Sequence, residues 1–286
     1  MPKKDLEALA AELVDAGSRE HYADAVLYDY EYRRRRADVT FYRQLAKQRC
    51  GTSGKILELG AGSGRVTIPL ARDGHEVVAI DQMPPMLARL HQRAEKLSKS
   101  TAKRIETVAA DICTFTVPQT FSLAIAAFNV LEHLYTRVEF EACLRRVAAH
   151  LEPDGAFAFD VQLPDLEWLM RDPTKRWAKT RYTDPVTGRA MLYSTNHDYD
   201  PVTQICIIRL YYEPVDGKGP TKIVKLTQRK YFPAELEALV AHAGFRVAAR
   251  YGDFFWGELT GTAESQVLVC EPIGAPKPRR TSRPKR

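Results

Sequence analysis

Short apolar runs alternate with amphipathic stretches along most of the chain. Residues 55–59 and 76–80 are apolar runs of strand length, and residues 65–73 and 85–99 place apolar side chains at helical spacing. Further strands are expected at 105–109, 121–128, 156–161, 245–251 and 266–271, and further helices at 5–16, 37–49, 137–150 and 233–243. Strands that alternate with helices predict a parallel sheet with helices on both faces, a doubly wound α/β fold.

Residues 176–232 interrupt this alternation. Three segments at 189–199, 204–214 and 221–231 resemble strands, with turn signals at Asp184-Pro185 and Asp216-Gly217. Apolar and polar positions partly alternate in them, which is typical of an antiparallel sheet with one exposed face. We interpret the segment as a β insertion that forms a lid over a substrate site.

The predicted organisation follows from these patterns. We expect an N-terminal helical cap at 1–50, the main domain at 51–175 and 233–272, the β insertion at 176–232 and a disordered basic tail at 273–286. Tyr22, Tyr28, Tyr30 and Tyr32 form an aromatic cluster in the N-terminal part. Two interpretations of this cluster stay open: a cap over a ligand, or helices packed outside the sheet.

Composition and charge narrow the class of protein. Hydrophobic residues make up 45% and charged residues 27% of the 286 residues, as in ordinary globular proteins. The net charge of +6 equals the number of Lys and Arg residues after Pro272, so residues 1–272 are formally neutral. This balance does not favour a dedicated nucleic-acid binder, although the tail could contact RNA, DNA or anionic lipid.

Neither a membrane segment nor a metal site is expected. No apolar run approaches the roughly 20 residues that span a bilayer, and the charged first residues lack the apolar core of a signal peptide, so we expect a cytoplasmic protein without a membrane partner. The five cysteines are scattered without a C-x-x-C pair, which argues against a disulfide framework and a zinc site. A homo-oligomer is compatible with the sequence.

A glycine-rich loop follows the first strand of the main domain. It spans Glu58 to Gly64 and opens a helix, where the backbone must turn sharply and approach a ligand with no Cβ in the way. The dinucleotide fingerprint G-x-G-x-x-G requires a small third residue, whereas Arg65 or Thr67 stands there, depending on the starting glycine.

Acidic residues end the next two strands. A carboxylate at Asp81 is placed to accept hydrogen bonds from both hydroxyls of a ribose. Asp111 follows the third strand and can accept from the exocyclic amine of an adenine, while Met83 and Ile112 could line the faces of that ring. The segment from Asn129 to Leu134 follows the fourth strand, at the sheet edge where chemistry usually occurs.

This ordered set resembles the class I S-adenosylmethionine-dependent methyltransferases. The similar segments are Ile56–Arg65, Ala79–Asp81, Ala110-Asp111 and Ala243–Phe245, and bacterial enzymes acting on amino sugars and glycine-like amines look most similar. The resemblance implies a seven-stranded sheet with an antiparallel last strand, and S-adenosylmethionine as cofactor. The residues expected to bind it are Glu58, Gly60, Ala61, Gly62, Gly64, Asp81, Gln82, Met83, Asp111, Ile112 and Asn129.

The expected function is methyl transfer to nitrogen or oxygen of a small-molecule acceptor, without a metal. His133 is the candidate base because it follows the fourth strand and its ordinary pKa is near neutrality, although it could instead cap a helix or pack near the adenine. The alternative candidates for the base are Glu132, Asp160, His197 and Tyr193. The expected acceptor-binding residues are Tyr193, His197, Tyr211, Phe255 and Trp256. Alternative hypotheses are an RNA or protein methyltransferase docked through the basic tail, and a sensor that binds the cofactor without turnover.

Overall fold

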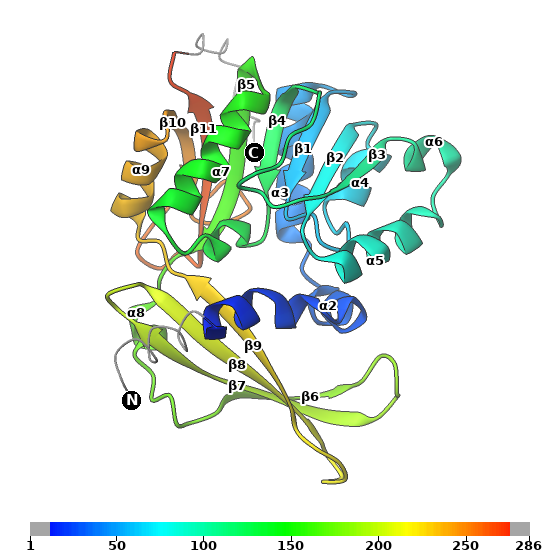
Figure 1. The fold of residues 1–286 in the computed structure, drawn as a ribbon, viewed down its shortest axis with the longest axis vertical. Helices are drawn as coiled ribbons and strands as arrows, with labels where there is room; N and C mark the ends of the chain where they lie inside the picture. The colour runs from blue at the N-terminus through cyan, green and yellow to red at the C-terminus, as the bar shows by residue number, and fades with distance from the viewer. Residues whose placement is uncertain (1–11, 275–286) are drawn as a thin grey trace.

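The computed structural model describes residues 12–274 and contains two β-sheets, of which the larger carries helices on both faces (Figure 1). Its strands lie in the order β10-β11-β5-β4-β1-β2-β3. Neighbours run parallel from β5 to β3, and β11 runs antiparallel to β5 and β10. The predicted doubly wound, seven-stranded fold with an antiparallel last strand is therefore confirmed. These strands are β1 (Lys55–Leu59), β2 (Glu76–Asp81), β3 (Ile105–Ala109), β4 (Phe121–Ala126), β5 (Leu151–Gln162), β10 (Phe245–Tyr251) and β11 (Ser265–Pro272).

Two helical layers bury the faces of this sheet. In β1, Ile56 belongs to the buried cluster that contains Phe41 on one face, while its neighbour Leu57 belongs to the cluster that contains Phe140 on the other. Successive side chains of a strand point to opposite faces, so a strand buried on both sides reads as a continuous apolar run. One face carries α3 (Ala37–Cys50), α4 (Thr67–Arg72) and α5 (Pro84–Ala94), and the other carries α7 (Arg137–His150) and α9 (Pro233–His242).

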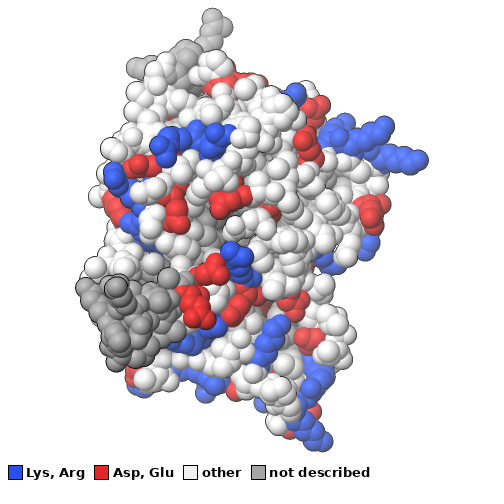
Figure 2. Space-filling model, in the orientation of Figure 1, with Lys and Arg blue, Asp and Glu red and all other residues white. Residues whose placement is uncertain are grey.

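The second sheet lies below the carboxyl ends of the parallel strands of the first (Figure 1). Its antiparallel order is β6-β7-β8-β9, and its apolar face buries Ile208, Leu210 and Leu226 against Leu27 of α2 (Ala25–Tyr32). The strands are β6 (Trp177–Thr183), β7 (Ala190–Asp200), β8 (Ile205–Pro214) and β9 (Lys222–Arg229). Basic and acidic side chains are interspersed over the face in Figure 2. In residues 12–274, every helix is too short or too polar to cross a membrane.

The N-terminal segment lies between the two sheets. Residues 12–19 are helical, and η1 (Glu20–Tyr22) and α2 follow. Glu31 accepts a hydrogen bond from Tyr212 Oη of the second sheet at 2.8 Å, and Asp29 accepts one from Ser63 Oγ of the glycine loop at 2.5 Å. Residues 12–36 therefore bridge the two sheets, whereas α3, placed in the predicted cap at 1–50, packs on the larger sheet.

Some predicted boundaries differ from the structure. The helix expected at 85–99 ends at Ala94, and a separate short helix α6 (Lys99–Ala102) begins where Ser98 caps it. The turn expected at 153–155 lies within β5, and β6 is an additional strand whose mostly exposed residues lack a run of apolar side chains. Most of the helix expected at 5–16 and nearly all of the predicted tail lie outside the described residues.

Candidate active site

The glycine loop turns tightly between β1 and α4. Gly60 and Gly64 have φ values of +63° and +80°, in the left-handed region that favours glycine. A Cβ on Gly60 would lie 2.4 Å from Cγ2 of Val130, so a larger residue would also collide with the loop after β4. The N–H of Gly62 donates to Oδ2 of Asp81 at 2.7 Å. The loop is thus held by the acidic residue that ends the next strand.

Asp81 is almost buried and anchors two backbone segments at once. Its Oδ1 accepts from the N–H of Met83 at 2.7 Å, while Oδ2 accepts from Gly62. Burial raises the pKa of this carboxyl, and these two hydrogen bonds oppose the rise. A carboxylate has about four acceptor positions, so roughly two stay available for hydroxyl groups of a ligand.

A cavity of about 210 Å³ opens beside Asp81. The sequence-predicted cofactor residues that line it are Gly60, Gly62, Asp81, Gln82, Met83, Asp111 and Ile112. It combines a carboxylate, glycine backbone and the apolar side chains of Met83 and Ile112. This donor and acceptor set fits the ribose, amino acid and adenine parts of S-adenosylmethionine.

Four of the predicted cofactor residues lie outside that lining. Glu58 is buried beneath the loop, where it accepts from Thr67 Oγ1 at 2.6 Å and burial raises its pKa to about 7. Ala61 packs in the core, and Gly64 donates its N–H to the Ala61 carbonyl. Asn129 lines a different, neighbouring cavity. The first three shape the loop from its buried side, whereas Gly60 and Gly62 form the side that faces the cavity.

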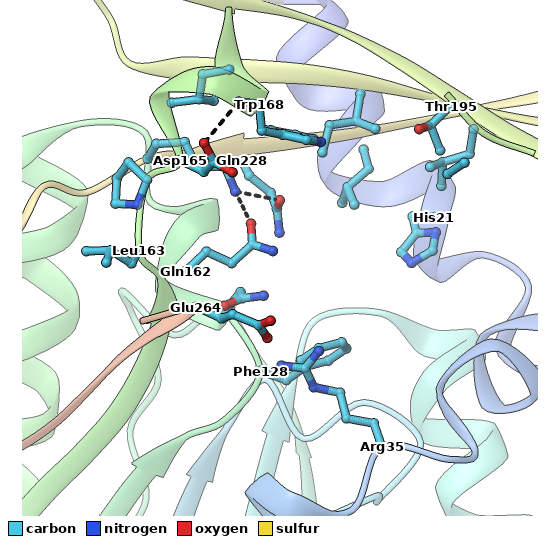
Figure 3. Close-up of a pocket in the computed structure, with 18 of the residues that line it drawn as sticks. His21, Arg35, Phe128, Gln162, Leu163, Asp165, Trp168, Thr195, Gln228 and Glu264 are labelled. Atoms are coloured by element: carbon cyan, nitrogen blue, oxygen red, sulfur yellow. Dashed lines mark hydrogen bonds between the residues drawn. The ribbon is translucent and has the colours of Figure 1, made fainter. Parts of the chain in front are cut away.

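The neighbouring cavity measures about 930 Å³ and lies between the larger sheet and the β insertion (Figure 3). In Figure 3, Trp168 and Gln228 lie on one side, and Phe128 and Arg35 lie on the opposite side. Aromatic and acidic side chains are prominent in its lining; they are Tyr22, Tyr28, Tyr32, Phe128, Trp168, Tyr193, Asp165, Glu167 and Glu264. Its volume is in the range of ligand-sized pockets.

The two cavities meet at three aromatic residues. Tyr22, Tyr28 and Phe128 are the residues that line both of them in the described part of the chain. Two of the three come from the N-terminal segment, which supports the interpretation of the aromatic cluster as a cap over a ligand. The sequence marked the cluster but could not show its position, because the contacts that place it join residues more than 100 positions apart.

His133 lies at this junction, on the side of the smaller cavity. Its Nε2 is 2.6 Å from Tyr22 Oη and its Nδ1 is 3.2 Å from Tyr135 Oη. Burial, assisted by His21 and Lys230, lowers the pKa of His133 to about 4. The imidazole is therefore neutral near pH 7 and is a weak base. In the described residues, no group of three or more His, Cys, Asp or Glu side chains could hold a metal ion.

Only Tyr193 of the predicted acceptor-binding residues lines the larger cavity. His197 instead stacks on Trp168, 3.9 Å between ring centroids, and bonds to its carbonyl. Tyr211 donates a hydrogen bond to Asn196. Because Tyr211 follows Leu210 in β8, its side chain lies on the opposite face of the strand from Leu210, which lines the cavity. The remaining two predicted residues, Phe255 and Trp256, lie away from both cavities: Phe255 is 76% exposed, and Trp256 packs on Phe41 of α3 and donates to Gln44.

Lys230 is a cavity residue that the sequence did not suggest. It is 1% exposed, and its Nζ donates to Glu132 at 2.7 Å, Gln162 at 2.5 Å and Gln228 at 3.0 Å. Gln162 ends β5 and Lys230 follows β9, so this cluster joins the chain segments that enter and leave the β insertion. An isolated lysine that follows a strand carries no local signal of such a role.

The fold matches the α/β fold of the class I methyltransferases. Residues 56–155 match the family described as "Methyltransferase domain". S-adenosylmethionine is the methyl donor of this class, and the smaller cavity carries the groups that would hold it.

Curated relatives match part of the chain. The cypemycin N-terminal methyltransferase of a Streptomyces species is 32% identical over 109 residues, which are 38% of this chain and 42% of the relative. The ubiquinone biosynthesis O-methyltransferase of Methylocella silvestris is 35% identical over 92 residues, 31% of this chain and 33% of the relative. The chain thus matches less than half of the length of these relatives.

Solved structures match over most of the fold. The CcbJ methyltransferase of Streptomyces caelestis has a TM-score of 0.71 at 23% identity, covering 83% of this chain and 90% of its own. CalS10, an amino pentose methyltransferase of Micromonospora echinaspora, has a TM-score of 0.65 at 17% identity, covering 87% and 96%. The similarity therefore extends beyond the matched domain to the arrangement of both sheets.

Proposed function

We propose that the protein transfers the methyl group of S-adenosylmethionine to a nitrogen atom of a small-molecule acceptor in the larger cavity. The observation that carries this proposal is the meeting of the two cavities at Tyr22, Tyr28 and Phe128. A donor in one cavity and an acceptor in the other would face each other there, and methyl transfer requires such alignment of nucleophile and leaving group.

The chemistry at the junction favours an amine over a hydroxyl acceptor. Bound S-adenosylmethionine supplies a methyl group on a sulfonium, which the nitrogen lone pair attacks as the carbon–sulfur bond breaks toward sulfur. A neutral amine can attack before it loses its proton, whereas a hydroxyl requires a base. Burial raises the pKa of Tyr22 well above its usual range, so this hydroxyl stays protonated near pH 7. His133 has a pKa of about 4 and is a weak base, so neither group is suited to take a proton from a hydroxyl acceptor.

The residues of the chain would position the acceptor and exclude water. The Tyr22 hydroxyl, oriented by His133, can hydrogen-bond an incoming nitrogen. Aromatic rings of Tyr28, Tyr32 and Phe128 surround the same point and disfavour water. Acidic side chains at Asp165 and Glu264 in the lining suit an acceptor that carries positive charge after transfer. The names of relatives include both N- and O-methyltransferases, so the argument for nitrogen rests on the site itself.

Radiolabelled S-adenosylmethionine with a panel of amino sugars, aromatic amines and their hydroxyl counterparts tests this proposal. We expect label on amines and much less on matched alcohols. Tyr22→Phe should lower turnover by up to about tenfold, the worth of one hydrogen bond. The control Tyr30→Phe lies in the next helix, α2, with its ring against Tyr182 and outside both cavities, and should turn over normally. Label only in RNA or protein, or cofactor binding without transfer to any acceptor, would overturn the proposal.

A further inference from the structure

Two consecutive non-glycine residues have left-handed backbone conformation at the junction of the cavities. Phe128 has φ +69° and Asn129 has φ +63°, and no other two adjacent non-glycine residues in 12–274 share a positive φ. A bulky aromatic residue rarely adopts this conformation, and such strain persists only where the surrounding structure enforces it. The strain therefore requires a structural cause.

The cause is the carboxylate of Asp160, near the end of β5. Its Oδ1 accepts from the N–H of Phe128 at 2.8 Å, and its Oδ2 accepts from the N–H of Asn129 at 3.3 Å. Tyr42 Oη, which is fully buried, donates to the same Oδ1 at 2.6 Å and fixes the carboxylate from the other side. Two successive N–H groups thus bond to one carboxylate, and hydrogen bonds to an ionised acceptor are stronger than those between neutral groups.

The strained pair places an aromatic ring where donor and acceptor would meet. Phe128 is the only residue of the larger sheet and its connecting loops, in the described part, that lines both cavities. Tyr32 packs edge-on against its ring at 4.8 Å, and the guanidinium groups of Arg35 and Arg65 lie 4.6 and 4.8 Å from its centroid. With a right-handed or extended backbone at residue 128, the side chain would leave the chain in another direction.

We propose that Asp160 is a positioning residue for methyl transfer: its carboxylate holds Phe128 and Asn129 in the left-handed conformation that makes the Phe128 ring the wall between cofactor and acceptor. This inference rests on the proposed function of the two cavities. Asp160 is 1% exposed and lines neither cavity, so it acts through the backbone of Phe128 and touches no reactant.

Asp160→Asn with a glycine rescue tests this role. The amide keeps the size of the side chain but offers one acceptor oxygen and turns an N–H₂ toward the backbone. We expect kcat on the best amine of the panel to fall at least tenfold, with the Kd for S-adenosylhomocysteine within twofold, because Gly62 and Asp81 are untouched. The double variant with Asn129→Gly should recover much of the lost kcat, because glycine adopts positive φ without penalty. The reference for this recovery is the kcat of the single variant Asn129→Gly.

A matched control comes from a second carboxylate. Asp253 Oδ1 accepts from the N–H groups of Phe255 and Gly257 around Trp256, another non-glycine residue with positive φ, away from both cavities. Asp253→Asn should leave kcat unchanged. Wild-type kcat in Asp160→Asn overturns the inference. A loss that glycine does not rescue also overturns it, because it would assign Asp160 a direct electrostatic role.

Two further measurements keep the inference testable in every case. If no amine is methylated, the proposed function fails. The NMR chemical shifts of Asn129 Cα and Cβ then still report whether Asp160→Asn releases the left-handed conformation. Unchanged shifts would overturn the positioning role. If Asp160→Asn does not fold, the wild-type kcat profile substitutes. Burial raises the pKa of Asp160 to about 6; Asp38 adds to this rise, and Tyr42 and Arg65 oppose it. Because protonation removes the charge that holds the Phe128 and Asn129 N–H groups, kcat should fall below about pH 6. An equally steep fall in Asn129→Gly would overturn the inference.

Discussion

The hydroxyl of Tyr22 lies 2.6 Å from Nε2 of His133, a hydrogen bond between residues 111 positions apart. It joins the N-terminal segment to η2 (Val130–His133), directly after β4. Because His133 Nδ1 also faces Tyr135 Oη, both ring nitrogens are engaged and the ring is fixed. The pair therefore sets the direction of a hydroxyl group at the point where the two cavities meet.

Replacing His133 separates orientation from base catalysis. His133→Phe should lower kcat by about tenfold or less, because the ring only orients Tyr22 through one hydrogen bond. Since the pKa of His133 is about 4, the wild-type profile should show no limb from this residue between pH 6 and 8. A loss of about 10²–10⁴-fold would instead support the predicted role as general base. Melting curves of the variant must accompany the kinetics.

Asp81→Ala should weaken binding of S-adenosylhomocysteine by about 1.5–3 kcal/mol, the range for hydrogen bonds to a charged group. The loss has two sources, the contacts to the ligand and the release of the Gly62 and Met83 N–H groups. Isothermal titration calorimetry measures it directly. Asp73→Ala, which removes a surface pair with Arg43, serves as the control, and equal affinity of both variants would contradict the assignment.

Stability should fall in mild acid because of His21. This buried residue bonds to Tyr32 Oη, and burial lowers its pKa from 6.5 to about 4. Between these two values the unfolded chain binds a proton that the folded chain does not, so stability is full above about pH 6.5 and decreases as the pH falls toward 4. From pH 7.5 to 5 the contribution is about 2 kcal/mol. Urea unfolding of His21→Gln should show a correspondingly smaller decrease, whereas an unchanged slope would refute this origin.

The buried ion pair of Lys230 and Glu132 should be strongly coupled. Lys230→Met leaves the fully buried Glu132 carboxylate without its cation and should cost about 3–5 kcal/mol of unfolding free energy. The double variant with Glu132→Gln should recover a large part of that loss, because no charge then stays buried. Urea denaturation of the four proteins in the cycle gives the coupling, and additive effects would show that the pair is not energetically linked.

The sequence predicted the features that depend on local order along the chain. The glycine loop and Asp81 were recognisable because parallel strands bring their carboxyl ends to one edge, and this edge carries the smaller cavity. It could not predict which way the aromatic side chains after β10 face: of the two expected at the acceptor site, Trp256 packs on Phe41 of α3 and Phe255 is exposed.

Contacts between distant segments were beyond the sequence. Lys230 reaches Glu132 across 98 positions, and Asp160 reaches Phe128 across 32. A single buried lysine or aspartate has the same appearance in a sequence as an exposed one. Only the assembled fold shows that these charges have neighbours that compensate the cost of removing them from water.

The bridging position of residues 12–36 has a consequence for how the protein is made. Glu20 pairs with Lys225 and Asp24 with Lys222, contacts that span 205 and 198 positions. During synthesis, residues 12–36 therefore leave the ribosome well before β9, the last strand of the β insertion, and can make these contacts only after β9 has followed. Closing such long loops is slow, so we expect the junction of the two cavities to form late in folding, after the larger sheet has begun to assemble.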